Sequence, residues 1–281
     1  MRYASIASGI EAPSVAWHEL GWVPVFFAEN DPAPSRILAR HYPAVPNHGD
    51  INGFREWPDH AIDLLVAGTP CQTFSLAGGR AGLDDPRGHL TLTGLAVADR
   101  YRPRWFIWEN VTGALSANGG RAFGSFLGGL ALIGFGFAYR VLDSCHFGSP
   151  LRGRRVFVVG HSGGDWRRAA AVLFERAATF ELRKEAAGVP RIDASGLAKK
   201  QTMPERGRCW TIHDGAGHRF LTPVEVERLF GFPDGYTGGQ ADGPRYKQLG
   251  NSMSVHVMRW IGRRIQMVED ASAEITAGRA A

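Results

Sequence analysis

The sequence has few cysteines and no two of them close together. Only Cys71, Cys145 and Cys209 occur among its 281 residues, and none belongs to a Cys-x-x-Cys pair. This pattern offers no framework for a structural metal and suits a reducing compartment, where disulfides are rare. His213 and His218 also lack enough neighbouring ligands for a metal site. We therefore expect neither disulfides nor a bound metal.

Long apolar segments are missing as well. The longest uncharged run, which includes residues 123–139, is shorter than a membrane span and contains several glycines. The first residues do not resemble a secretory signal peptide. The composition, 44% hydrophobic and 21% charged, is that of an ordinary globular protein with one large domain or a main domain and a small one. These features predict a cytoplasmic protein that does not contact a membrane.

The excess positive charge is concentrated in one part of the chain. The sequence has 32 Lys and Arg against 27 Asp and Glu, a net charge of +5. Within residues 161–208 there are ten Lys and Arg against six Asp and Glu, which accounts for most of that excess. Such a segment is typical of an insert that faces nucleic acid, and the alternative is a basic surface that only contacts solvent.

Apolar runs and helix-like segments alternate through the first 160 residues. This rhythm predicts an α/β fold with a doubly wound, mostly parallel sheet and helices on both faces. A Gly at 21 ends the first helix, and Asp31 before Pro32 is expected to cap the second. The strands are expected at 3–7, 23–28, 62–67, 105–108, 137–142 and 156–159, and the helices at 12–20, 36–41, 91–100 and 122–133.

The rhythm fails after His161 and returns at the C-terminus. Apolar residues from Val255 to Val268 follow helical spacing behind two possible caps, Asn251 and Ser252. We expect this last helix to pack back on the first domain. The chain is thus predicted to have a catalytic and cofactor-binding domain at 1–160, completed by 246–281, and a small target-recognition domain with a hinge at 161–245.

Polar or small residues follow several of the expected strands. In a doubly wound sheet, ligands bind at the carboxyl ends of the strands. A post-strand acid can accept hydrogen bonds from a ribose diol or an adenine amino group, and the absence of a Gly-x-Gly-x-x-Gly motif favours an adenosyl cofactor without phosphates. The alternative for each residue is a plain turn or a helix cap. The residues are Ser8, Gly9, Ile10, Glu29 and Asn30, together with Asp50 and Ile51, which follow the next helix.

A thiol and a carboxylate follow two further strands. Cys71 comes after the run 62–67, and Glu109 comes after the run 105–108. Side chains at neighbouring strand ends can face one pocket. The alternatives are an inert buried thiol and a helix cap or surface acid.

Four segments, "GTPCQTFS", "WENVTG", "RFLTPVEVERLFGFPDGY" and "YKQLGNSMSV", resemble the DNA (cytosine-5)-methyltransferases in their order along the chain. The resemblance covers both ends of the chain and leaves the basic insert unmatched. It implies a Rossmann-like, S-adenosylmethionine-dependent fold with a small inserted target-recognition domain. It also implies double-stranded DNA as the partner and methylation of carbon 5 of a cytosine flipped out of the duplex.

The resemblance assigns roles to individual residues. Cys71 would attack carbon 6 of the base, Glu109 would bond to N3, and Arg155 would lie near O2. The segment 73–90 would close over the base, and 222–236 would form the hinge. The cofactor set would be Ser8, Gly9, Ile10, Glu29, Asn30, Asp50, Ile51, Pro70, Asn251 and Ser252, and the DNA-binding set Gln72, Ser75, Arg80, Arg87 and Arg219. We expect a monomer, and the resemblance leaves open whether a restriction enzyme accompanies it.

Two segments depart from the family pattern. The first motif reads Ala-Ser-Gly-Ile-Glu-Ala at 7–12 and lacks an aromatic residue and two glycines. At 150–155, Leu151 and Gly153 replace a Gln and an Arg, although Arg152 or Arg154 could substitute after a shift in register. These departures keep a second hypothesis open, a DNA-binding relative with impaired catalysis. A third is an RNA cytosine-5 methyltransferase, whose Cys-Phe-Thr tripeptide this chain lacks.

Overall fold

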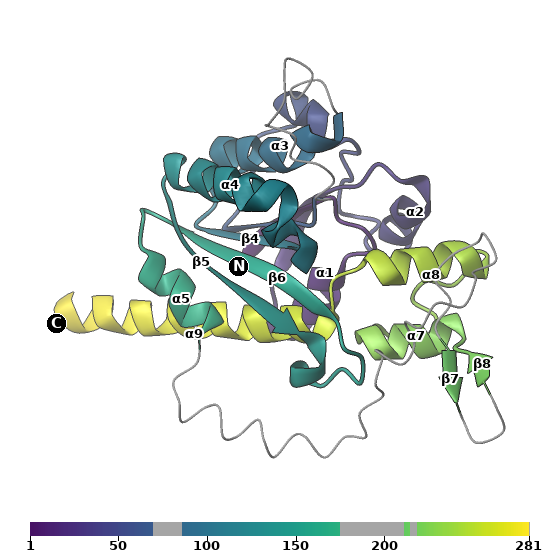
Figure 1. Cartoon of the computed structure of the whole chain (residues 1–281). Coiled ribbons are helices and arrows are strands. Elements are labelled where there is room, and N and C mark those ends of the chain that lie inside the picture. Colours follow the sequence, from purple (N-terminus) through teal and green to yellow (C-terminus); the bar gives the residue numbers. More distant parts are fainter. Residues whose placement is uncertain (70–85, 175–210, 214–217, 281) are drawn as a thin grey trace.

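The fold is built on a six-stranded sheet (Figure 1), here in a computed structural model. The structure describes residues 1–69, 86–174, 211–213 and 218–280, and it describes side chains for residues 1–69, 90–174 and 219–274. The strand order is β2-β1-β3-β4-β6-β5. The strands are β1 (Arg2–Ile6), β2 (Val23–Ala28), β3 (Leu64–Ala67), β4 (Trp105–Val111), β5 (Phe135–Asp143) and β6 (Arg154–Ser162).

All strands of this sheet except β6 run in the same direction. β1 pairs in parallel with β2 and β3, and β3 pairs in parallel with β4, whereas β6 lies antiparallel between β4 and β5. Every residue of β3 is fully buried, as expected for a central strand covered on both faces. The predicted doubly wound, mostly parallel sheet is confirmed.

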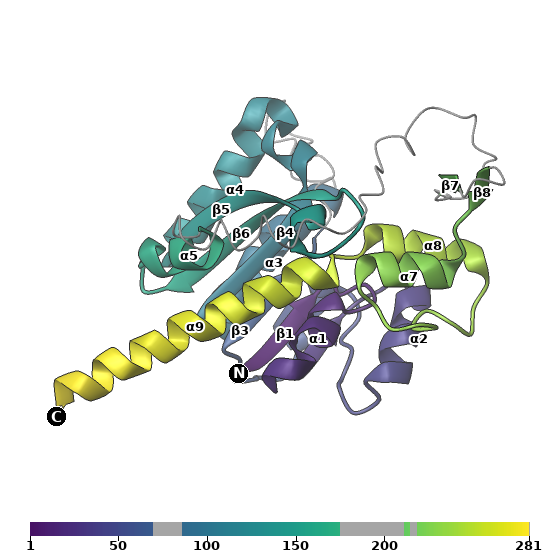
Figure 2. The same cartoon turned by 90° about the horizontal axis from the view of Figure 1, so that it is seen from below.

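Helices cover both faces of the sheet (Figure 2). On one face, α1 (Ala12–Trp17), α5 (Trp166–Leu173) and α9 (Val255–Ala280) contribute to one apolar cluster. On the other face, α3 (Pro86–Tyr101) and α4 (Arg121–Leu132) contribute to a second cluster. Helix α2 (Pro32–His41) begins after Asp31, whose carboxylate accepts a 2.9 Å hydrogen bond from the Ala33 amide. The expected cap and the expected two-faced cover are therefore confirmed.

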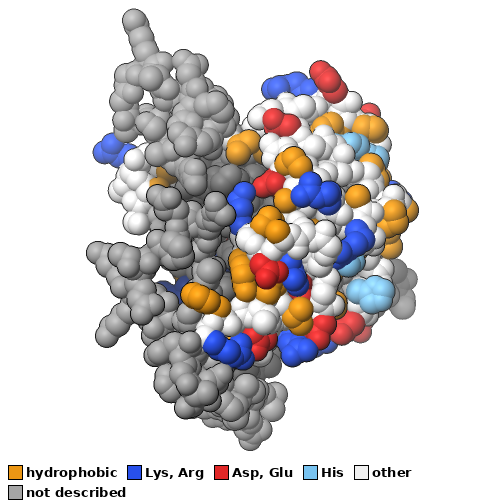
Figure 3. Space-filling view, turned by 90° about the vertical axis from the view of Figure 1, so that its right-hand side faces the viewer, with side chains coloured by type: hydrophobic (Ala, Val, Ile, Leu, Met, Phe, Trp, Pro, Cys, Tyr) orange, Lys and Arg blue, Asp and Glu red, His pale blue; other side chains and the backbone are white. Residues whose placement is uncertain are grey.

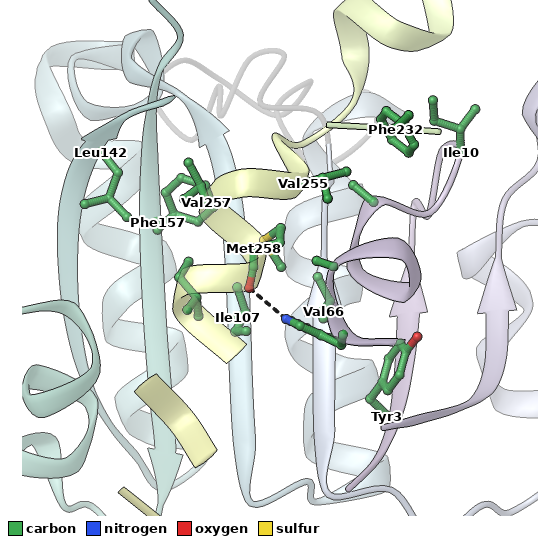
Figure 4. Close-up of a cluster of buried hydrophobic side chains, with 14 of the residues drawn as sticks. Tyr3, Ile10, Val66, Ile107, Leu142, Phe157, Phe232, Val255, Val257 and Met258 are labelled. Carbon is green, nitrogen blue, oxygen red and sulfur yellow. Dashed lines mark hydrogen bonds between the residues drawn. The ribbon is translucent and has the colours of Figure 1, made fainter. Parts of the chain in front are cut away.

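The C-terminal helix packs back on α1, as the sequence predicts. The indole nitrogen of Trp17 donates a 2.7 Å hydrogen bond to the Met258 carbonyl, drawn as a dashed line in Figure 4. Trp17 is fully buried. A Cβ atom at Gly262 would lie 2.3 Å from its indole nitrogen, so only glycine allows this approach.

The expected caps of this helix are wrong. Asn251 is the last residue of α8 (Asp242–Asn251), and Ser252 is the C-cap of that helix, with its amide bonded to the Leu249 carbonyl. Helix α9 begins only at Val255. Asn and Ser favour both kinds of helix end in sequence, and the preceding helix was not anticipated.

The remaining described elements lie between α5 and α9. Strands β7 (Thr211–His213) and β8 (His218–Phe220) form an antiparallel pair, and α7 (Pro223–Phe230) follows with a Thr222–Glu225 capping box. Helix α5 falls in the range expected for the small domain but contacts β5, β6 and α9. The division into two domains stays a prediction. No helix in the described part of the chain is long and apolar enough to cross a membrane.

Candidate active site

The carboxyl ends of β1, β2, β3 and β4 meet at one edge of the sheet, and most predicted site residues follow these ends. The Gly9 amide donates a 2.8 Å hydrogen bond to the Glu29 carboxylate, which joins the loops after β1 and β2. A Cβ atom at Gly68, just after β3, would lie 3.1 Å from both the Ala7 carbonyl oxygen and the Met253 methyl group. The α8–α9 connection therefore reaches the same edge.

The loop after β1 has an unusual backbone. Ala7, Gly9 and Glu11 all have positive φ, at 47°, 57° and 64°. The Ser8 hydroxyl donates to the Ser5 carbonyl at 2.8 Å and accepts from the Ala28 amide at 3.2 Å. Positive φ in non-glycine residues is strained and occurs often at functional sites.

Glu11 stands where the family pattern has glycine, and its side chain enters the core. It is fully buried and its carboxyl group accepts a 3.2 Å hydrogen bond from Ser14, whose oxygen lies 2.5 Å from the Tyr3 hydroxyl. Burial raises the pKa of Glu11 to about 8, so its carboxyl group is largely protonated at neutral pH. Residue types alone did not indicate this buried acid.

Glu29 and Asp50 carry the acceptors expected to bind an adenosyl group. Glu29 accepts the Gly9 amide on one oxygen and the Asp31 amide on the other, both at 2.8 Å, and burial raises its pKa. Asp50 is exposed and caps the 3-10 helix Ile51–Glu56 by accepting from the Asn52 amide at 2.9 Å. Asp50 thus caps a helix and Glu29 joins two loops, and the carboxylate oxygens of both have further lone pairs that can accept hydrogen bonds from a ligand.

The other predicted cofactor residues differ in exposure. The side chains of Ile10 and Ile51 are buried, so these residues can meet a ligand only through their main chain. Asn30 and Asn251 are exposed, and the Ser252 hydroxyl donates to the Met253 carbonyl at 3.0 Å.

Two predicted catalytic residues lie together. Arg155 Nε is 3.1 Å from Glu109 Oε1, because β6 pairs with β4 in a register that sets Arg155 opposite Val111. Glu109 is buried, and its burial raises the pKa to about 7 although Arg155 lowers it. A carboxyl group with this pKa can hold or release a proton near neutral pH.

The segment 150–155 is ordered by contacts that differ from the family pattern. Leu151 is buried in the core, and its carbonyl accepts a 2.7 Å hydrogen bond from the Ser144 hydroxyl. A Cβ atom at Gly153 would lie 2.9 Å from Ser144 Oγ. Alternation along β6 places Arg154 on the face opposite to Arg155. Whether Arg152 or Arg154 takes the place of the arginine missing at Gly153 stays a prediction.

A hydrogen-bonded cluster not anticipated from the sequence includes the two residues that flank Glu109 in β4. The Trp108 indole donates to the Thr69 hydroxyl at 3.0 Å, which lies 3.3 Å from the Thr91 hydroxyl. The Asn110 side chain donates to the Thr69 carbonyl at 2.8 Å. All four residues are buried. In the sequence, Trp108 and Thr91 each place a polar group inside an apolar segment. Because buried donors need hydrogen-bond partners, these two groups were the only sequence feature that could have indicated the cluster.

Several predicted residues lie outside the described residues: Pro70, Cys71, Gln72, Ser75 and Arg80, together with the side chain of Arg87. Arg219 is described, and its guanidinium group binds the Glu225 carboxylate through two hydrogen bonds of 2.8 and 2.9 Å. On the described part of the face in Figure 3, basic and acidic side chains are interspersed. No His, Cys, Asp or Glu cluster suited to a metal occurs among residues with described side chains.

Comparison with known proteins shows a family of DNA methyltransferases, although one relative is named for a different base. The family model described as C-5 cytosine-specific DNA methylase matches residues 1–179 and 167–267. The Type II methyltransferase M.NgoBI of Neisseria gonorrhoeae is 34% identical over 89% of this chain and 88% of its own length. A protein of Escherichia phage P1, named DNA N-6-adenine-methyltransferase, is 29% identical over 94% of this chain, which spans 61% of that protein.

Solved structures show the same fold. The S. pombe Dnmt2 methyltransferase superposes with a TM-score of 0.71 at 17% identity, over 94% of this chain and 98% of that chain.

Proposed function

Because the chain belongs to the C-5 cytosine-specific DNA methylase family, we propose that it transfers a methyl group from S-adenosylmethionine to carbon 5 of a cytosine in a short sequence of duplex DNA. The observation that carries this proposal is the pairing of the buried Glu109 with Arg155 at the carboxyl edge of the sheet, with a glutamate pKa of about 7. Glu109 lies on β4, the strand next to β3, and the chain continues from β3 into Thr69, Pro70 and Cys71.

The described residues fit the cofactor of this family. S-adenosylmethionine supplies an activated methyl group when it is bound. Glu29 carries a carboxylate in the loop after β2 and Asp50 carries one at the start of the 3-10 helix Ile51–Glu56, and each can accept further hydrogen bonds from a ribose or an adenine amino group. The loop 7–11 reaches the same edge of the sheet. These residues would hold the cofactor beside the strand that leads to Cys71.

Cytosine carbon 5 is a weak nucleophile, so the base must be activated first. The Cys71 thiolate would form a bond to carbon 6, and the electrons displaced towards N3 would be met by the proton that Glu109 holds there. The guanidinium group of Arg155 would keep the Glu109 carboxyl group oriented and bind the base oxygen. After carbon 5 accepts the methyl group, N3 returns its proton to Glu109 and the proton of carbon 5 passes to solvent. The electrons of that C–H bond re-form the double bond between carbons 5 and 6, and the bond from carbon 6 to sulfur breaks to release the Cys71 thiolate.

A base stacked in duplex DNA cannot reach such a site, so the target cytosine would have to be flipped out. The departures at Leu151 and Gly153 leave the Glu109–Arg155 pair in place. Leu151 packs in the core, and Gly153 makes room for Ser144. This favours an active enzyme over a DNA-binding relative with impaired catalysis.

The decisive experiment measures the product base. Purified protein is incubated with S-adenosylmethionine and either mixed-sequence duplex DNA or structured RNA, and the digested nucleosides are separated by mass spectrometry. We expect 5-methylcytosine in DNA, loss of it in Cys71→Ser, and retention in Cys145→Ser, which tests a cysteine without a proposed role. N6-methyladenine, methylation of RNA alone, no product, or a product that survives Cys71→Ser would overturn the proposal. Bisulfite sequencing of DNA from expressing cells then gives the target sequence.

A further inference from the structure

The loop 7–11 needs outside support to keep its conformation. Ala7 and Glu11 have positive φ without being glycine, and such backbone persists only where neighbouring groups hold it. Two supports come from nearby in the sequence. Ser8 bonds to β1 and β2, and the Gly9 amide bonds to Glu29.

A third support comes from the far end of the chain. The Tyr236 hydroxyl donates a 2.9 Å hydrogen bond to the carbonyl oxygen of Ile10. Tyr236 is buried, and so is Ile10, which lies with Phe232 in the cluster drawn in Figure 4. One side chain from the C-terminal part of the molecule thus contacts the main chain of the proposed cofactor loop.

The ring of Tyr236 is itself held firmly. The His41 ring stacks on it at a centroid distance of 4.0 Å and an interplanar angle of 5°, and the centroid of the Phe232 ring lies 4.8 Å from that of Tyr236. The Tyr42 hydroxyl lies 3.3 Å from the Tyr236 hydroxyl. His41 Nε2 lies 2.9 Å from the Tyr236 carbonyl oxygen, and Arg40 also bonds to that oxygen.

The turn that carries Tyr236 is anchored on a buried acid. Glu227, which is fully buried in α7, accepts hydrogen bonds from the Gly235 amide at 2.6 Å and the Thr237 amide at 2.8 Å. Arg245 compensates its charge at 3.2 Å. Both amides that flank Tyr236 are therefore fixed, which leaves its hydroxyl little freedom to move away from Ile10.

We propose that Tyr236 is a positioning residue, whose hydroxyl holds the loop 7–11 in the conformation that binds S-adenosylmethionine. This inference rests on the proposed function and deepens it, because it places one determinant of cofactor affinity in the 222–236 segment. Tyr236 acts through Ile10, since its hydroxyl is directed to a main-chain oxygen within the buried cluster.

The test uses Tyr236→Phe in the full chain. This substitution removes the hydroxyl group and leaves a ring that still fits between His41 and Phe232. We expect the dissociation constant for S-adenosylmethionine, measured by calorimetry without DNA, to rise about tenfold, the effect of one lost buried hydrogen bond. KM for S-adenosylmethionine should rise in parallel, whereas kcat at saturating cofactor and KM for DNA should stay within about twofold.

Tyr246→Phe is the matched control. Its hydroxyl also bonds to a main-chain carbonyl, that of Leu221 at 2.5 Å, in the same part of the chain. It should lower the melting temperature by a comparable amount and leave cofactor affinity unchanged. If Tyr236→Phe binds as tightly as the wild type, or Tyr246→Phe loses as much affinity, the inference fails and the proposed function stands. If the wild type binds no S-adenosylmethionine, the proposed function fails, and this inference with it.

Discussion

Arg155 and Glu109 form an ion pair of 3.1 Å across the antiparallel strands β6 and β4, at the edge of the sheet where the proposed base pocket lies. The pair is partly shielded from water, with the Glu109 side chain 10% exposed. Burial raises the pKa of Glu109 to about 7 and Arg155 opposes that rise. Near neutral pH the carboxyl group is therefore divided between its protonated and ionised forms.

Glu109→Gln should slow methyl transfer strongly. The amide keeps the shape of the side chain but cannot give a proton to N3 of the base, so we expect a loss of roughly 10²–10⁴-fold in the single-turnover rate. In the wild type, this rate should decline above about pH 7 as Glu109 loses its proton. The variant should lack that decline.

An exposed acid provides the control for this measurement. Glu56→Gln changes a glutamate on the surface and should leave both the rate and its pH profile unchanged. If Glu109→Gln reacts at a rate within twofold of the wild type, Glu109 does not donate the proton to the base.

The buried Glu11 makes the stability of the protein depend on pH. Burial raises its pKa in the folded state to about 8, well above the value in the unfolded chain. A raised carboxyl pKa stabilises the fold fully below the unfolded value, and this contribution is lost as the pH rises towards 8. Glu11→Gln removes this titration and keeps a neutral side chain of the same shape.

We therefore expect Glu11→Gln to match the wild type at pH 4.5 and to be more stable at pH 8, by about 2–4 kcal/mol. Urea unfolding of both proteins at the two pH values measures this difference. The exposed Glu56→Gln should show no such change between the two pH values. Equal unfolding free energies at pH 8 for Glu11→Gln and wild type would contradict the prediction.

The central part of the fold was predictable from sequence because its strands are short apolar runs buried on both faces. Residues 64–67 are an example, since all four are fully buried in β3. Strand β5 was predicted too short, because the range 137–142 omits Phe135 and Gly136 at its start and Asp143 at its end. Gly and Asp are uncommon in strands, so the sequence pattern stops before the strand does.

Sequence alone could predict the site residues that the strand order or a local motif brings together, but not the contacts between distant segments. Parallel strands bring their carboxyl ends together, so the sequence alone is enough to group Gly9, Glu29 and Glu109. The Tyr236–Ile10 bond joins residues 226 positions apart, and no local pattern indicates it. The same holds for Glu11, whose burial depends on where its αL backbone directs the side chain.

The Thr69 cluster should matter for both stability and catalysis. Thr69→Val leaves the buried Trp108 indole without its acceptor, which costs about 1–3 kcal/mol of unfolding free energy. Thr91→Val keeps that bond and removes only the hydroxyl 3.3 Å from Thr69, so it should cost less. Because Thr69 directly precedes Pro70 and Cys71, Thr69→Val should also slow single-turnover methylation.

Thr93→Val is the matched control on the same helix. The Thr93 hydroxyl forms an exposed hydrogen bond of 3.4 Å with the Asn52 side chain. Its removal should change neither the stability nor the single-turnover methylation rate. Thermal melting gives the stability ranking, and quenched single-turnover reactions give the rates. A ranking in which Thr93→Val is as damaging as Thr69→Val would show that the cluster has no special role.

Gly262→Ala should reverse the usual effect of adding a methyl group to a helix. In an exposed helix interior, Gly→Ala stabilises by about 1 kcal/mol. At Gly262, however, the added Cβ would lie 2.3 Å from the Trp17 indole nitrogen, which donates to the Met258 carbonyl. The indole is fully buried and can move only by disturbing α1, so we expect a net loss of about 1–3 kcal/mol. In α4, nothing lies within 4 Å of a Cβ atom added at Gly128, so Gly128→Ala should instead raise the unfolding free energy. Urea unfolding of both variants measures these changes. Opposite signs would establish the α1–α9 contact as the cause of the loss in Gly262→Ala.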